Sequence, residues 1–109
     1  MTWSVKYLPE ALQELESLEG SSKILVRKAI QKVSQNPLPD YKGGYGHPLS
    51  NKHGINLAGF MKIKLKAAGL RIVYKIECHD NKMLIIIIGV RADNEVYEAA
   101  IKRIQKYQI

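Results

Sequence analysis

The sequence contains little that would place it outside the cell or in a membrane. It has one cysteine among its 109 residues, so Cys78 cannot form a disulfide within the chain, and we expect a reducing, cytoplasmic compartment. The longest apolar run, MLIIIIGV, is far too short to cross a bilayer as a helix. The first residues lack the charged start and apolar stretch of a secretory signal. We therefore expect no membrane association.

Acidic residues are also scarce. The chain has 17 lysines and arginines against 10 aspartates and glutamates, which gives a net charge of +7. Such a balance favours a negatively charged partner, namely nucleic acid, a ribosomal surface, anionic lipid or an acidic protein, but it does not specify a fold. With 46% hydrophobic residues, the chain is long enough for one modest core, so we predict a single domain over 1–109.

The periodicity of apolar residues predicts an α+β fold with the order βααβββα. The expected elements are a strand at 2–8, helices at 9–18 and 22–35, strands at 57–65, 70–77 and 82–91, and a last helix with Asn94 as its N-cap. They predict a mostly antiparallel four-stranded sheet packed against an N-terminal helical hairpin, with a C-terminal helix. Because IIII is unbroken, the last strand is expected in the interior of the sheet with both faces covered.

The segment 36–56 carries three of the four prolines and much of the glycine, so we predict a loop there. His47 and His53 fall in this loop, and His79 falls in a turn after the strand at 70–77. No spacing joins these histidines to the row of lysines at 62–66, so we interpret them as loop residues and keep His53 as an outside candidate for catalysis. Cys78 and His79 have no second pair at ligand spacing, so no metal site is predicted.

The stretch GFMKIKLKAAGLRIVYKI, at 59–76, predicts a hairpin with an unusual face. Alternation puts Lys62, Lys64 and Lys66 on one side, and a turn at 66–69 would place Arg71 opposite Lys64. Like charges directly opposite each other destabilise a sheet by roughly 0.2–1 kcal/mol, so folding alone would not select this pair. Two interpretations stay open on spacing alone: an ordinary solvated lysine face, or a surface for a polyanion.

Two further residues bear on that choice. Arg91 ends the last predicted strand, and Tyr97 follows in the first turns of the last helix, so the short connection keeps them close together. An arginine and an aromatic ring beside a row of lysines suit RNA, because cations hold phosphates and a ring stacks on an unpaired base. The alternative for Tyr97 is a residue of an amphipathic helix that packs on the sheet.

The segments KIKLKAAGLRIVYKI, GVR and EVYEAAIKRI, in this order, resemble the RelE family of bacterial toxins, part of the RelE/ParE superfamily of type II toxin–antitoxin systems. The similarity extends over nearly the whole chain. It implies a ribosome-dependent endoribonuclease that cuts mRNA in the ribosomal A site without metal or cofactor. The resemblance also implies a set of catalytic positions, namely Lys62, Lys64, Arg71, Arg91 and Tyr97. Lys66 has no family role, and we expect it only to attract phosphate.

The resemblance also implies partners. These are an acidic, RelB-like antitoxin, the ribosome with mRNA in its A site, and DNA only indirectly through the antitoxin complex. An alternative is a ParE-like toxin that inhibits DNA gyrase by binding, although such relatives generally lack the full set of cations. A basic protein-binding module or an inactive toxin copy is the third alternative. One departure from the family is Met61, where the best-known relatives have tyrosine; we expect it to alter packing or RNA contact nearby.

The implied reaction is attack of a 2′-hydroxyl on the adjacent phosphate, which needs a base, an acid and cations. A free lysine has a pKa of about 10.4 and is a poor base at neutral pH. Neighbouring positive charges disfavour the protonated form of a lysine, so Lys64 is the candidate base. Lys62 and Arg71 would hold the phosphate, Arg91 would serve the leaving group, and Tyr97 would stack on or orient a base. Proton transfer from arginine is chemically awkward.

Overall fold

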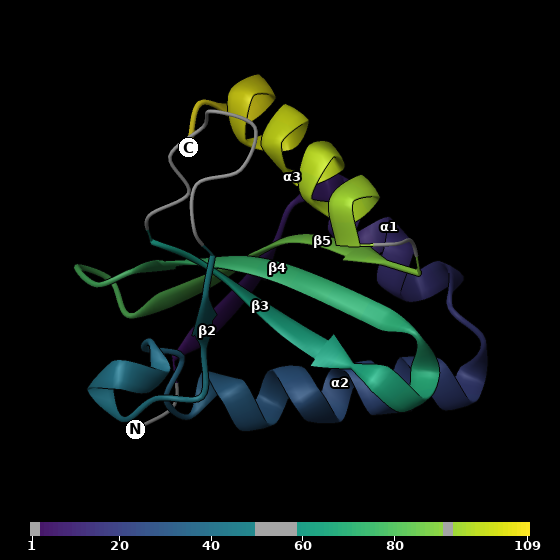
Figure 1. Ribbon diagram of the computed structural model, residues 1–109, viewed down its shortest axis with the longest axis horizontal. Coiled ribbons are helices and arrows are strands. Elements are labelled where there is room, and N and C mark those ends of the chain that lie inside the picture. Colours follow the sequence, from purple (N-terminus) through teal and green to yellow (C-terminus); the bar gives the residue numbers. More distant parts are fainter. Residues whose placement is uncertain (1–2, 50–58, 91–92) are drawn as a thin grey trace.

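The computed structural model describes residues 3–49, 59–90 and 93–109, without the side chains at 93 and 94. In chain order the elements are β1 Ser4–Tyr7, α1 Pro9–Ser17, α2 Gly20–Ser34, the 3₁₀ helix η1 Asp40–Lys42, β2 His47–Pro48, β3 Phe60–Leu65, the 3₁₀ helix η2 Lys66–Ala68, β4 Leu70–Glu77, β5 Lys82–Gly89 and α3 Asp93–Tyr107. Figure 1 shows α3 and α2 on opposite sides of the sheet, with α1 beside β5.

The sheet has five strands in the order β1-β5-β4-β3-β2, with β1 parallel to β5 and every other pair antiparallel. This confirms the predicted α+β class and the mostly antiparallel sheet. The strand count was one too low, because β2 pairs with β3 inside the segment that we predicted as a loop. α3 begins at Asp93, so Asn94 lies inside the helix and its predicted N-cap role was wrong.

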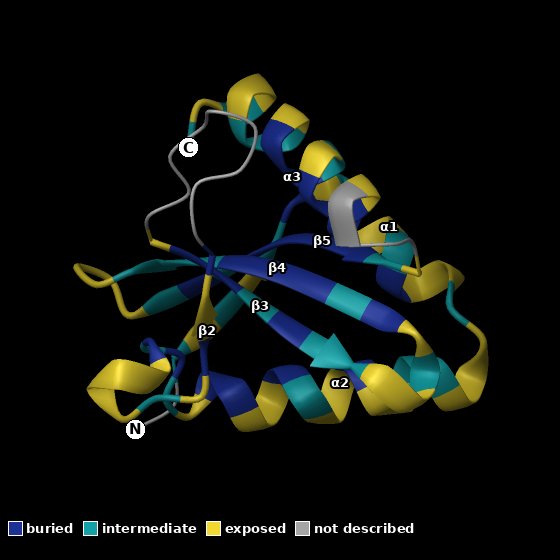
Figure 2. Cartoon of the chain, in the orientation of Figure 1, coloured by how far each residue is buried: buried dark blue, intermediate teal, exposed yellow. Residues whose placement is uncertain are grey.

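The isoleucine run forms the buried interior of the sheet, as predicted. β5 lies between β1 and β4, and its residues from Ile85 to Ile88 are at most 3% exposed. Figure 2 shows β4 and β5 as largely buried, whereas the outward sides of the helices are exposed. Burial of each such side chain stabilises the fold by roughly 1.5–3 kcal/mol, so this strand contributes substantially to the stability of the core.

One edge of β5 is completed by side chains. β1 ends at Tyr7, opposite Ile85, so the following backbone groups of β5 need other partners. The backbone N–H of Ile88 donates to the Glu14 carboxylate at 3.1 Å, and Arg103 donates to the carbonyl of Ile86 at 3.0 Å. Arg103 also donates two hydrogen bonds of 2.8 Å to Glu14. Helices α1 and α3 are thereby joined to the strand at the place where β1 stops.

The segment between α2 and β3 packs closely on the sheet. A Cβ atom at Gly46 would lie 2.6 Å from Met61 Sδ and would also overlap the Tyr74 hydroxyl. That hydroxyl donates to the carbonyl of Pro37 at 3.0 Å, and burial raises the pKa of Tyr74. Only glycine permits this approach, which brings the following strand β2 against β3.

A second contact joins the end of α3 to the start of α1. The Tyr107 hydroxyl and the Lys106 ammonium donate to the two carboxylate oxygens of Glu10, at 2.6 and 3.0 Å. These hydrogen bonds, from Tyr107 first and then Lys106, lower the pKa of Glu10 from its ordinary 4.5 to about 2. The charged form of Glu10 is therefore favoured in the folded protein.

We expect this contact to make stability depend on pH in the acid range. Because the folded pKa of Glu10 lies below the unfolded one, its contribution is present above pH 4.5 and is lost as the pH falls towards about 2. Urea unfolding of the wild type and of Glu10→Gln should give a difference that is largest near neutral pH and shrinks across that window. Glu16→Gln, an exposed change on α1, is the control. A constant difference from neutral pH to about pH 2 would contradict the role of the Glu10 charge.

Among the described residues, no helix combines the length and apolar character that a membrane span requires.

Candidate functional site

The β3–β4 hairpin has the predicted register. Lys64 pairs with Arg71, and Lys62 pairs with Val73. The turn is η2 followed by Gly69, whose φ of 67° lies in the left-handed region that favours glycine. The hairpin therefore holds Lys64 and Arg71 side by side on one face of the sheet.

The opposite face of β3 belongs to the core. Met61 is 1% exposed and Ile63 is 8% exposed, whereas Lys62 and Lys64 are half-buried. Alternation along the strand thus separates a cationic face from an apolar one. Met61, which stands where the best-known relatives have tyrosine, therefore lies on the core side of β3. There it packs against Gly46, so this difference affects packing in the core.

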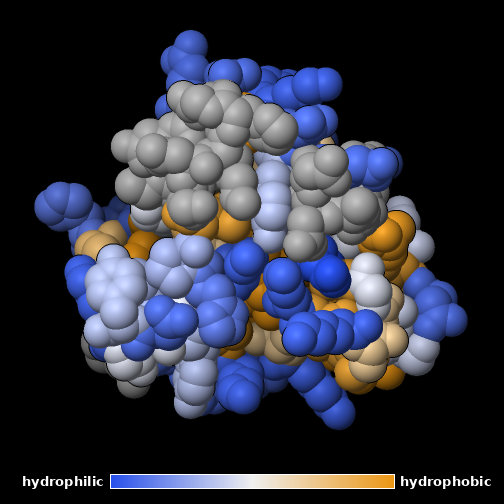
Figure 3. Space-filling model, in the orientation of Figure 1, coloured by the Kyte–Doolittle hydropathy of each residue, from blue (hydrophilic) through white to orange (hydrophobic). Residues whose placement is uncertain are grey.

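A hollow of about 360 Å³ opens on the cationic face. Its lining residues are His47, Lys62, Lys64 and Lys66. Figure 3 shows hydrophilic side chains gathered in this region, over β3 in the same orientation as Figure 1. We call these four residues together with Arg71 the cationic face. Such a hollow, rimmed by positive charge, suits a phosphate group.

His47 is the residue that the sequence interpretation missed. It lies on β2 directly opposite Lys62, and its Nδ1 atom is 3.2 Å from Oδ2 of Asp40. The sequence pattern that could have predicted this strand was weak, because β2 is only two residues long and shows no periodicity. Pro48 is compatible with this position, since β2 is an edge strand and proline is tolerated at sheet edges.

Tyr97 packs beneath the cationic face. It is 4% exposed, and the Lys62 ammonium lies 5.9 Å from the centroid of its ring, at the outer limit of a cation–π contact. In this conformation the ring is buried, as in the packing alternative, and is not open to stack on a base. Tyr97 is thus placed to orient Lys62.

The remaining sequence candidates lie elsewhere or outside the described part of the chain. Arg91 and His53 lie outside the described residues. His79 is exposed in the turn between β4 and β5. Arg71 pairs with Gly89, so the end of β5 comes beside the cationic hairpin.

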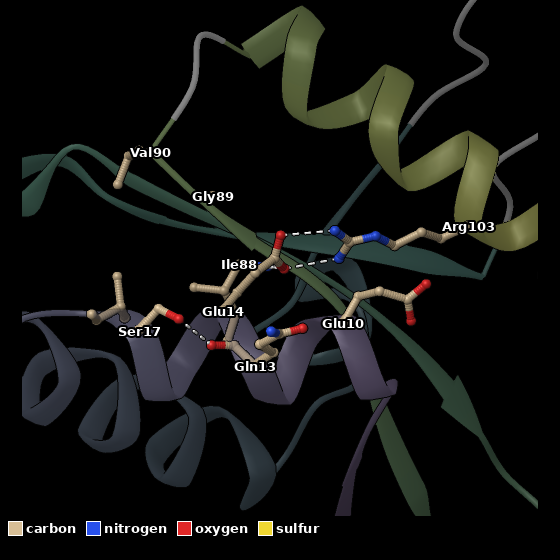
Figure 4. Close-up of a pocket in the computed structure, with 9 residues that line it drawn as sticks. Glu10, Gln13, Glu14, Ser17, Ile88, Gly89, Val90 and Arg103 are labelled. Atoms are coloured by element: carbon tan, nitrogen blue, oxygen red, sulfur yellow. Dashed lines mark hydrogen bonds and ion pairs between the residues drawn. The ribbon is translucent and has the colours of Figure 1, made fainter.

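A larger hollow, of about 430 Å³, lies beside α1, α3 and the end of β5 (Figure 4). Glu14 and Arg103 are joined there by the two hydrogen bonds drawn as dashed lines in Figure 4. Glu14 also accepts from the backbone N–H of Ile88, and Arg103 donates to the carbonyl of Ile86. Its principal charged groups are thus engaged in holding the fold together. We assign this hollow a structural role.

The fold and the cationic face define a small, basic α+β protein with a positively charged hollow on its sheet. The chain is 28% identical over 106 residues to a RelE-like toxin protein of Escherichia coli, covering 96% of this chain and 100% of the relative. It is 27% identical over 104 residues to the mRNA interferase toxin RelE of Escherichia coli, covering 95% and 99%. No family model matches it.

Solved structures agree with these relatives. A mutant of E. coli toxin RelE in the free state superposes with a TM-score of 0.75 at 25% identity, covering 95% of this chain and 99% of that one. The intact E. coli RelBE toxin–antitoxin complex gives 0.65 at 20% identity, covering 83% and 98%, a likeness of fold. Together these likenesses show that the chain is similar, over nearly its whole length, to toxins of the RelE family.

Proposed function

We propose that this protein is the toxin of a toxin–antitoxin system and that it inhibits translation as a ribosome-dependent endoribonuclease. In this proposal it cuts mRNA in the ribosomal A site by metal-independent attack of the 2′-hydroxyl. The observation that carries the proposal is that Lys64, which lines the hollow together with Lys62 and Lys66, pairs with Arg71 across the hairpin. The relative named mRNA interferase toxin RelE, 27% identical over almost its full length, supports the same activity.

Electrostatics favour a functional purpose for the cationic face. Lys64 lies opposite Arg71, and like charges directly opposite each other typically destabilise a pair of strands by roughly 0.2–1 kcal/mol. The same pair becomes favourable when a phosphate lies over it, because the positive charges then stabilise the negative charge that develops on the phosphorane. In this proposal, the two positive charges that repel each other in the free protein both attract the phosphate when RNA is bound.

The lysines and the arginine of the cationic face have distinct roles in this proposed reaction. Lys64 takes the proton of the attacking 2′-hydroxyl, while Lys62 and Arg71 hold the phosphate. Lys66 is exposed at the rim and adds general attraction for RNA. Tyr97 lies beside Lys62 and orients it, and Arg91 is proposed to stabilise the negative charge on the leaving oxygen. The ribosome would supply the geometry of the substrate, since the rate of such a reaction depends strongly on alignment.

An antitoxin is the proposed protein partner. The net charge of +7 favours an acidic, RelB-like chain. A structural relative has been solved as an intact toxin–antitoxin complex, which supports the same kind of partner. Contact with DNA would then be indirect, through the antitoxin complex.

The test is to induce the protein in bacterial cells and to map the 5′ ends of mRNA across the transcriptome. We expect new ends in register with codons within minutes of induction, together with arrest of translation. Arg71→Ala should remove those ends, whereas Lys28→Ala, an exposed change on α2, should keep them. Growth arrest with DNA-damage signalling and no new mRNA ends would contradict the proposal and favour the gyrase alternative.

A further inference from the structure

Strand β2 brings a histidine to the cationic face. His47 pairs with Lys62 in the antiparallel β2–β3 ladder. Directly opposed residues of such a ladder point to the same face, and His47 accordingly lines the hollow with Lys62, Lys64 and Lys66. Lys64 is the diagonal neighbour of His47, at a typical Cα separation of about 7–8 Å. This spacing lets the two side chains reach opposite sides of one phosphate.

Asp40 holds the histidine from the side of η1. The 3.2 Å contact between its Oδ2 and Nδ1 of His47 leaves Nε2 as the ring nitrogen for a substrate. The two side chains are 60% and 51% exposed, so a large RNA can reach them.

The reaction of the proposed function lacks a good proton donor for its leaving group. When the P–O5′ bond breaks, the O5′ oxygen needs a proton, and arginine does not release one readily. An imidazolium is the ordinary side-chain donor near neutral pH. His47 places an imidazole at the edge of the same hollow, beside the Asp40 carboxylate.

We propose that His47 is the general acid of the RNA cleavage and that Asp40 is its positioning residue, an inference that rests on the proposed function. The 2′-hydroxyl gives its proton to Lys64 as the O2′–P bond forms. The P–O5′ bond then breaks, and O5′ takes the proton from Nε2 of His47. The products are a 2′,3′-cyclic phosphate and a 5′-hydroxyl, with Lys64 protonated and His47 neutral.

The first experiment measures single-turnover cleavage of a defined mRNA in the A site of purified bacterial ribosomes. His47→Gln should lower the rate by about 100-fold, the low end of what a general acid contributes. Asp40→Asn should give a smaller loss, and His79→Gln, an exposed change in the β4–β5 turn, should give none. The thermal midpoints of the variants should match that of the wild type, because both side chains are exposed.

The second experiment replaces O5′ at the cleaved linkage by sulfur, a leaving group that needs no proton. Wild type and His47→Gln should then cleave at similar rates, whereas Lys64→Ala should remain slow because the 2′-hydroxyl still needs a base.

The outcomes separate the two proposals. If the wild type does not cleave the oxygen substrate, both the proposed function and the role of His47 fall. If the wild type cleaves and His47→Gln cleaves equally fast, only the role of His47 falls. If His47→Gln is slow on both substrates, His47 acts on binding or structure, and the assignment as general acid is overturned.

Discussion

Lys64→Ala is expected to lower the rate of ribosome-dependent mRNA cleavage by about 100-fold or more, the range in which a general base contributes. The free energy of unfolding should change little or rise, because Lys64 lies opposite Arg71 and its removal relieves like-charge repulsion. The measurement is single-turnover cleavage on ribosomes, combined with urea unfolding of the same preparations.

Two further variants distinguish proton acceptance by Lys64 from the effect of its positive charge. Lys64→Arg keeps the positive charge but cannot accept a proton near neutral pH, so it should be nearly as slow as Lys64→Ala. Lys28→Ala removes one positive charge from the exposed side of α2 and should cleave at close to the wild-type rate. Full activity of Lys64→Arg would show that Lys64 acts only through its charge, and the assignment as base would be wrong.

Arg103→Met is expected to destabilise the protein by about 2–3 kcal/mol, the range for leaving polar groups of a partly buried pair without partners. Arg103 and Glu14 are 16% and 26% exposed at their side chains, and the change would remove the hydrogen bonds to Glu14 and to the Ile86 carbonyl. In a domain of this size the thermal midpoint should fall by about 10 °C or more.

The control for this change is Lys102→Met, an exposed change on the same helix, which should unfold within about 0.5 kcal/mol of the wild type. A double-mutant cycle with Glu14→Gln should give a coupling energy of about 1 kcal/mol or more, because the two side chains are in direct contact. An Arg103→Met variant as stable as the wild type would mean that the edge of β5 does not depend on this pair.

The hairpin and the interior strand could be predicted because their signals are local. Alternation along β3 and a glycine after the turn define a register, and the structure reproduces the pairing of Lys64 with Arg71. The run of four isoleucines predicts a buried strand by its composition alone, without knowledge of which strands pair with it. These features depend on residues that are close together in the sequence, which is where pattern-based inference is strongest.

The parts that escaped prediction depend on contacts between distant segments. β2 is placed because Gly46 lets its segment lie against Met61 and Tyr74 on other strands. The Arg103–Glu14 pair joins residues 89 positions apart. No periodicity marks either arrangement, so His47 was interpreted as a loop residue although it lies across from Lys62.

The cationic residues of the candidate site were predicted from the family resemblance, whereas the residues that surround them were identified only in the structure. Lys62, Lys64 and Arg71 came from the hairpin, whereas the pairing of His47 with Asp40 became visible only once the chain was folded. The burial of Tyr97 likewise became visible only in the folded chain.

In the proposed mechanism, the 2′-hydroxyl of the RNA attacks the adjacent phosphate, and one substitution in the substrate tests this step. After the cleavage site on a defined mRNA has been mapped, the nucleotide that bears the attacking hydroxyl is replaced by its 2′-deoxy form. Cleavage on ribosomes should stop at that position, while the unmodified mRNA should yield a 5′-hydroxyl on the downstream fragment. Continued cleavage of the 2′-deoxy mRNA at the same position would contradict the mechanism.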